Sequence, residues 1–190
     1  MLTRTNIGLT IEQDELKGFS RTIAEIEWLL LALVLLHLLA SSPSEEDKFA
    51  LHTATLLFTA FVLGLHYVHF YNLENRSKLM FEVWVMIVFI TWVVSHTGNI
   101  NSPLLNLYLA PIIASALIFC RLPTALKVGA IIACLMFFAY NPKSKTLLAM
   151  PFWGELLAIS APMILVAYFT TMLSADIRYG LNKVKLLSET

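Results

Sequence analysis

The chain has 190 residues, 58% of them hydrophobic, and its 13 Lys and Arg balance its 13 Asp and Glu. With a mean hydropathy of +0.73, this composition excludes an ordinary soluble domain and indicates an integral membrane protein. Its basic clusters all follow membrane topology, so the chain offers no surface for nucleic acid. The two cysteines, Cys120 and Cys134, lack the spacing of a metal or redox pair.

Residues 1–22 predict an amphipathic helix in the cytoplasm. Thr10 and Gln13 have the spacing of a capping box, which opens a helix. Apolar residues then recur at 3-4-3 spacing, at Leu16, Phe19, Ile23 and Ile26. We expect this helix to lie on the inner leaflet and to bend or run into the first span. A plain cytoplasmic extension of that span is the open alternative.

Six apolar runs follow, and each has about the 17–25 residues that cross the hydrocarbon core of a bilayer. They cover roughly residues 23–40, 49–71, 80–96, 103–120, 124–140 and 152–175. The sequence therefore predicts an all-α integral membrane bundle of six transmembrane helices within residues 23–175.

The basic residues predict the topology of this bundle. Nine of the thirteen Lys and Arg lie before the first run, after the sixth, or in the second and fourth loops, and a tenth, Lys127, lies on the same side at the start of the fifth run. The other three are Lys48, Lys143 and Lys145. By the positive-inside rule, we expect both termini of this multi-pass protein to be cytoplasmic.

Five carboxylates lie near the ends of the predicted spans. Glu25, Glu27, Glu82 and Asp176 are near the inner boundary, and Glu155 is near the outer one. We expect them to reach headgroups or to pair with Arg and Lys. The sequence contains no nucleophile with a neighbouring general base in the spacing of a catalytic site. We therefore expect no catalysis by this chain itself.

All five histidines lie in or at the ends of the first three runs: His37, His52, His66, His69 and His96. Ionisable residues inside a membrane are candidates for function. His37 and His52 have matching depth near the outer surface, and the 14-residue step from His52 to His66 resembles b-type cytochromes. We expect haem b near the outer leaflet, with His37 and His52 as the favoured axial pair and His96 as the substitute. Hydrogen bonding between helices is the open alternative.

The loop before residue 104 has a distinctive turn. Gly98 permits a tight turn, and Pro103 suits the first turn of a helix. The combination resembles the Thr-Gly-Gly-x-x-Asn/Ser-Pro turn of six-span sensor domains in RegB-type redox histidine kinases and membrane-bound diguanylate cyclases. The resemblance implies a quinone site at Thr97, Gly98, Asn101, Ser102 and Pro103. A well-made turn between helices is the open alternative.

Residues 176–190 predict the start of a signalling helix. Leu173, Ile177, Val184 and Leu187 occupy heptad a and d positions, with Gly180 on an intervening d position. This pattern favours a parallel coiled coil and hence a homodimer. An amphipathic tail on the inner leaflet is the open alternative.

Residues 183–190 resemble the linker that precedes a GGDEF domain in bacterial diguanylate cyclases. The resemblance implies a sensory input domain in the bacterial inner membrane that binds a redox cofactor or lipophilic ligand. It would control a C-terminal output domain that makes cyclic di-GMP. The alternatives are the sensor of a quinone-responsive histidine kinase and a stand-alone b-type electron-transfer cytochrome.

Overall fold

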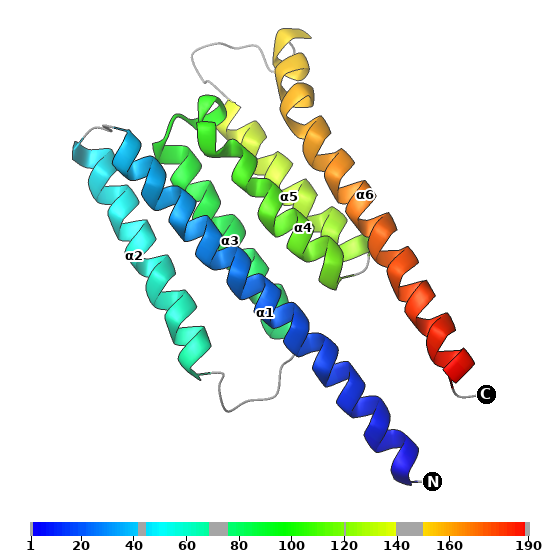
Figure 1. Cartoon of the computed structure of the whole chain (residues 1–190). Helices are drawn as coiled ribbons and strands as arrows, with labels where there is room; N and C mark the ends of the chain where they lie inside the picture. Colours follow the sequence, from blue (N-terminus) through cyan, green and yellow to red (C-terminus); the bar gives the residue numbers. More distant parts are fainter. Residues whose placement is uncertain (1, 42–44, 69–75, 120, 140–149, 189–190) are drawn as a thin grey trace. The chain divides into compact units, whose positions relative to one another are not determined.

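The computed structural model describes residues 2–41, 45–68, 76–119, 121–139 and 150–188 (Figure 1). These residues form helices and turns, with no strand among them, so the prediction of an all-helical fold is confirmed. In chain order the helices are α1 (Leu2–Ala40), α2 (Glu45–Val68), α3 (Arg76–His96), η2 (Asn99–Asn101), η3 (Pro103–Tyr108), α4 (Leu109–Ile118), α5 (Arg121–Ala139) and α6 (Met150–Ser188).

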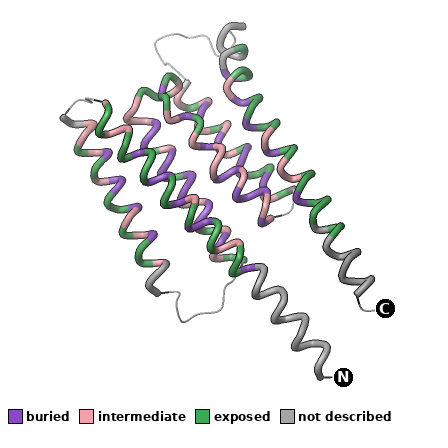
Figure 2. Tube along the Cα trace, viewed as in Figure 1, coloured by how far each residue is buried: buried purple, intermediate pink, exposed green. Residues whose placement is uncertain are grey.

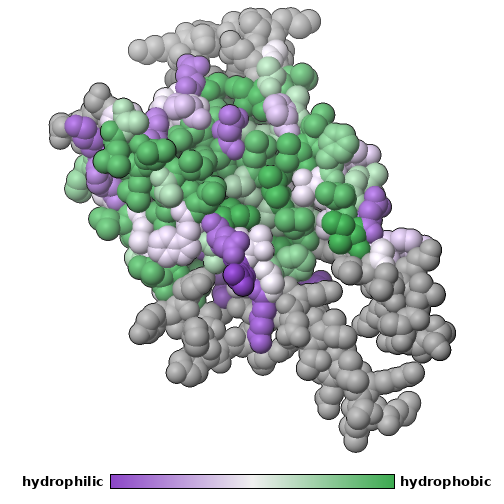
Figure 3. All heavy atoms as spheres, viewed as in Figure 1, coloured by the Kyte–Doolittle hydropathy of each residue, from purple (hydrophilic) through white to green (hydrophobic). Residues whose placement is uncertain are grey.

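Among the residues that the structure describes, four helices are long and apolar enough to cross a membrane. They cover Leu16–Ala40, Asp47–Leu65, Arg76–His96 and Leu156–Ile177. The predicted runs 103–120 and 124–140 correspond to two shorter apolar helices, Pro103–Ile118 and Leu122–Phe138. Apolar side chains also cover most of the visible surface of the described helices (Figure 3), as contact with lipid requires.

The chain divides into two compact units, Met1–Ala110 and Pro111–Thr190. In the first unit α1, α2 and α3 pack against one another, and η2 and η3 pack against α3. Buried residues recur every three or four positions along these helices, as one face of a helix requires (Figure 2). The core includes Ile23, Leu30, Val34, Leu51, Val62, Val83, Met86 and Ile90.

Helix α1 is longer than the sequence predicts. We expected a helix opening at Thr10, but α1 begins at Leu2 and runs without a break to Ala40. At 1.5 Å per residue its 39 residues extend about 58 Å, roughly twice the hydrocarbon thickness. Its first turns extend beyond the ends of α2 and α3 (Figure 1).

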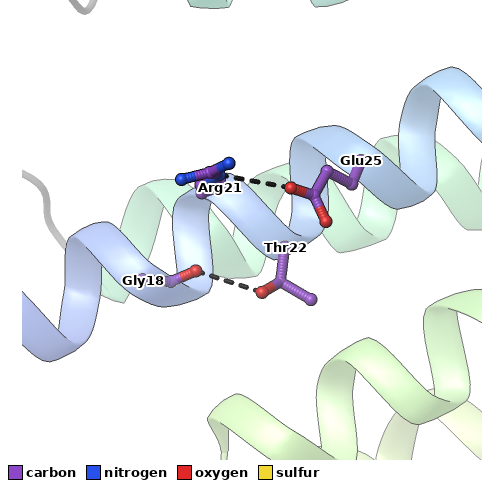
Figure 4. A network of polar contacts seen from close by, with 4 residues as sticks. All are labelled: Gly18, Arg21, Thr22 and Glu25. Carbon is purple, nitrogen blue, oxygen red and sulfur yellow. Dashed lines mark hydrogen bonds and ion pairs between the residues drawn. The ribbon is translucent and has the colours of Figure 1, made fainter.

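Two side-chain contacts lie at the predicted boundary between residues 22 and 23 (Figure 4), and the pair of Arg21 and Glu25 crosses it. The Thr22 hydroxyl donates to the Gly18 carbonyl at 3.1 Å, and Arg21 Nε pairs with Glu25 Oε1 at 3.2 Å. Each contact joins residues four positions apart, which is the spacing of neighbours on a helix surface. The predicted N-terminal segment and the first span are therefore one continuous helix.

The second unit contains α4, α5 and α6. Helix α5 packs against α6, and the Ser174 hydroxyl of α6 donates to the Leu117 carbonyl of α4 at 3.3 Å. Helix α6 has 39 residues and continues through Pro162 and Gly180 to Ser188. The sixth apolar run and the charged segment after it therefore form a single helix.

Candidate functional site

A groove of about 320 Å³ lies between α2 and α3 in the first unit. All but one of the residues that line the groove are apolar. The lining residues are Thr53, Ala54, Leu57, Phe58, Phe61, Val85, Val88, Phe89 and Trp92. The rings of Phe58 and Phe89 stack with centroids 4.1 Å apart and planes 5° from parallel. Both rings are buried, so they form a fixed aromatic wall of the groove.

The groove continues toward the end of the first unit at which α1 ends, α2 begins and α3 ends. We call this the histidine end, because His37, His52 and His96 lie on those three helix ends. His52 directly precedes Thr53 of the groove, and the His96 ring stacks on Trp92 with centroids 5.6 Å apart. The structure thus puts two histidines next to residues that line the groove.

The rings of His52 and His96 are oriented in the same way. Each Nδ1 bonds to the backbone carbonyl four residues earlier, at 2.7 Å to Lys48 and at 3.0 Å to Trp92. A carbonyl oxygen only accepts, so Nδ1 carries the proton of the neutral ring. Nε2 then bears the lone pair, which can accept a hydrogen bond or coordinate a metal.

The structure describes fewer contacts for the other three histidines, His37, His66 and His69. His37 is partly buried, and its backbone carbonyl accepts from Ser41 Oγ at 2.7 Å. The side chain of His66 and the whole of His69 lie outside the described residues. Within the described ranges, no group of three or more His, Cys, Asp or Glu side chains could hold a metal ion. His37, His52 and His96 therefore do not make a common three-ligand site.

The turn at residues 97–103 uses its hydroxyl groups internally. Thr97 Oγ1 donates to the Val93 carbonyl at 2.9 Å and lies 2.5 Å from Ser102 Oγ. Ser102 Oγ is buried and accepts from the Leu104 backbone N–H at 3.2 Å, so it caps η3. Gly98 has φ of 119°, a conformation that glycine adopts without steric cost. This geometry favours a structural turn between helices over a ligand site.

The predicted ligand residues of this turn have different exposures. Thr97 and Ser102 are engaged as described above, whereas Gly98, Asn101 and Pro103 are exposed. Quinone binding by these five residues stays a prediction.

Two of the five carboxylates form the expected ion pairs, whereas a third lies in an unexpected place. As expected, Glu25 pairs with Arg21, and Glu82 Oε1 lies 3.5 Å from Lys78 Nζ. Glu27 was expected to reach a headgroup or a cation, but its side chain is buried inside the first unit, with the residue 3% exposed. Its Oε1 has no hydrogen-bond partner among the described residues.

The burial of Glu27 could have been read from helix periodicity. Glu27 lies four positions after Ile23 and three before Leu30, on the buried face of α1. Of the other two carboxylates, Asp176 is exposed, and the Glu155 side chain lies outside the described residues.

The second unit buries Lys127, which was expected at the inner surface of the membrane. Lys127 is 1% exposed, and its Nζ donates to Ser115 Oγ at 3.1 Å. The same ammonium lies 4.1 Å from the centroid of the Phe119 ring, and Ser115 Oγ is 3.3 Å from Thr124 Oγ1. Lys127 is three residues after Thr124, so the buried face of α5 again contains the signal.

Compared with protein-family models, curated proteins and solved structures, the chain matches none of them.

Proposed function

We propose that this chain is a membrane sensory input domain that binds a lipophilic ligand in the groove between α2 and α3. It controls a C-terminal diguanylate cyclase through α6. The observation that supports this most directly is the groove itself, with its stacked aromatic wall and its two neighbouring histidines. An apolar cleft with a few polar groups at one end is a common form of small-molecule site.

The chemistry of the groove fits a quinone and its quinol. A planar ring packs well against Phe58, Phe89 and Trp92, and an isoprenoid tail can extend into lipid. The Nε2 atoms of neutral His52 and His96 accept hydrogen bonds, and a quinol hydroxyl donates one whereas a quinone carbonyl cannot. The reduced ligand therefore binds more tightly, and this difference in affinity is what lets a ligand change an output.

The proposed topology has six spans and cytoplasmic termini. The shorter helices approach the required length, because η3 rises about 2 Å per residue and α4 about 1.5 Å. Together the 6 residues of η3 and the 10 of α4 extend about 27 Å, and the 19 of α5 about 28 Å. Both lengths are close to a hydrocarbon core of about 30 Å.

Helix α6 is the proposed output element. Like α1 it extends about 58 Å, so a large part of it can project beyond the bilayer. Two of its heptad residues, Leu173 and Ile177, are 60% and 51% exposed in the single chain. Exposed apolar a and d positions are what pairing with a second copy requires, which supports a homodimer.

A bound haem b is a second candidate, with His52 and either His37 or His96 as axial ligands. It is favoured by the Nδ1 contacts of His52 and His96 to backbone carbonyls, because this arrangement aims Nε2 at a metal. A cytochrome would be coloured when purified, with sharp visible bands after reduction. A colourless preparation from haem-replete cells would exclude it.

Photolabelling of the purified chain in nanodiscs tests the groove. The probe is a short-chain azidoquinone, used oxidised and after reduction, with labelled peptides identified by mass spectrometry. Leu57 lines the groove and is 67% exposed, whereas its neighbour Leu56 is 71% exposed and does not line it. We expect Leu57→Trp to fill the groove and reduce labelling about tenfold, equivalent to about 1.4 kcal/mol.

Leu56→Trp is the matched control and should label like the parent chain. His96→Leu should reduce the preference for the reduced probe while leaving the oxidised probe bound. Equal labelling of the Leu56 and Leu57 variants, or no preference for the reduced probe, would contradict the proposal.

A further inference from the structure

Two carboxylates are buried in the first unit, far from the histidine end, and a partly buried lysine pairs with one of them. Glu27 of α1 is 3% exposed and Glu82 of α3 is 5% exposed. Lys78 Nζ lies 3.5 Å from Glu82 Oε1, and the charged neighbours of Glu27 are Glu82 and Lys78. We call these three residues the Glu27–Glu82–Lys78 cluster. Glu27 lies thirteen residues before the end of α1, about 20 Å from the histidine end.

The charges of this cluster do not balance when all three groups are ionised. Two carboxylates and one ammonium leave one net negative charge in a low-dielectric interior, where an uncompensated ion costs several kcal/mol. One proton on a carboxylate makes the cluster neutral. Since Lys78 already pairs with Glu82, Glu27 is the carboxyl that takes the proton.

A second observation also singles out Glu27. Its Oε1 is buried and has no hydrogen-bond partner among the described residues. Leaving a buried polar atom unpaired costs more when the group is charged than when it is neutral. The unpaired oxygen therefore belongs to a protonated carboxyl and not to a carboxylate.

The other charged side chains that the structure describes on α1, α2 and α3 are exposed or lie at the far end of these helices. Helices α2 and α3 are the helices that pack most closely against α1. On α1, Glu25 and Arg21 form an exposed pair. On α3, Arg76 is exposed at the helix start. On α2 the ionisable residues with described side chains are Asp47, Lys48 and His52, and all three lie near the start of the helix, at the opposite end of the unit.

We propose that the Glu27–Glu82–Lys78 cluster is a proton-binding site that holds one exchangeable proton on Glu27 at neutral pH. Loss of the proton leaves two carboxylates between α1 and α3, and their repulsion opposes the packing of these helices. Proton occupancy is thereby coupled to the helix arrangement of the first unit. This activity is separate from ligand binding in the groove, and either can exist without the other.

Infrared difference spectroscopy of the full chain in liposomes tests the site. A protonated carboxyl in an apolar environment has a C=O stretch that is absent from a carboxylate, and an exposed glutamate is ionised at neutral pH. We expect this band in the parent chain at pH 7 and its complete loss in Glu27→Gln. Glu25→Gln is the matched control, because Glu25 is exposed on the same helix, and it should retain the band.

Two further variants test the charge balance. In Glu82→Gln the remaining Glu27 and Lys78 balance each other without a proton, so we expect the band to disappear. In Lys78→Met both carboxyls must be protonated for neutrality, so the band should grow about twofold. Circular dichroism establishes that each variant is folded.

The proposal is overturned if the parent chain lacks the band, or if the band persists in Glu27→Gln. Glu27→Gln is nearly isosteric and decides the question by itself if another variant does not fold. A band unchanged in Glu82→Gln would show that charge balance does not hold the proton, which also overturns the proposal.

Discussion

The two units of this chain bury ionisable side chains in different ways. The first unit holds Glu27 and Glu82 with Lys78, so its buried charges depend on one another. The second unit holds Lys127 with the neutral Ser115 hydroxyl and the ring of Phe119. An apolar helix bundle can thus accommodate a cation with oxygen dipoles and a π face, which attract positive charge.

A carboxylate cannot be accommodated in that way. The face of an aromatic ring is negative, so it repels a carboxylate and attracts an ammonium. A buried glutamate therefore needs a cation, N–H or O–H donors, or a proton. This difference explains why one unit has an unpaired carboxyl oxygen whereas the ammonium of the other is engaged.

Lys127→Glu should give the largest effect. The new carboxylate would face Phe119 with no cation nearby among the described residues of the second unit. Breaking a buried charge arrangement in this way costs about 3–5 kcal/mol. Unfolding in mixed micelles measures the loss, and Lys127→Met is the control. Methionine has a similar volume and no charge, so we expect a change within about 1 kcal/mol.

Lys78→Met tests whether the first unit behaves differently under the same substitution. Removing Lys78 leaves the two carboxyls without their cation, so we expect a loss of about 3 kcal/mol at neutral pH. Glu82 must take up a proton in this variant, so the loss shrinks as the pH is lowered. Unfolding measured at two pH values checks this. If Lys78→Met and Lys127→Met were equally mild, the contrast between the units would not hold.

Ser115→Ala should give an intermediate effect in the second unit. It removes the oxygen that accepts from Lys127 Nζ at 3.1 Å, and a hydrogen bond to a charged group contributes about 1.5–3 kcal/mol. A double-mutant cycle with Lys127→Met isolates the pair. Once Lys127 is methionine, Ser115→Ala should change the stability little. An equal loss in both backgrounds would mean that Ser115 contributes through packing and not through the ammonium.

The helical architecture could be predicted because apolar runs of this length have few other solutions in lipid. The residue at which α1 begins could not be predicted from the sequence. The Thr10 capping pattern is a local signal, and the chain before it is also helical, so α1 continues past it from Leu2. Helix boundaries depend on such small local differences, whereas the existence of a long apolar helix does not.

The candidate site was predicted only in part. The histidines and the turn at residues 97–103 could be found because polar residues are rare in apolar runs. The groove could not be predicted from the sequence, because it depends on how α2 and α3 pack against each other. Glu27 and Lys127 were assigned to the membrane surface from their positions near span ends. Their places on the buried faces of α1 and α5 are the signal that outweighs this assignment.

The smallest effect is expected at a neutral pair in the first unit. The buried Tyr108 hydroxyl donates to Thr91 Oγ1 at 2.9 Å, and Thr91 in turn donates to the Ile87 carbonyl at 2.7 Å. Tyr108→Phe removes one hydroxyl, leaves the ring in place and exposes no buried charge. We therefore expect a loss of about 1 kcal/mol, the net value of a neutral hydrogen bond.

This pair separates the effect of charge from the effect of location. Both Tyr108→Phe and Lys78→Met change the first unit, but only Lys78→Met removes a charge. If charge is what makes the first unit sensitive, Tyr108→Phe should cost less stability than Lys78→Met. Unfolding in mixed micelles at two pH values checks this, and the loss in Tyr108→Phe should not depend on pH, because no proton is gained. A loss as large as that in Lys78→Met would mean that the first unit is sensitive to any polar substitution. The contrast between the two units would then come from packing density and not from the charge of the Glu27–Glu82–Lys78 cluster.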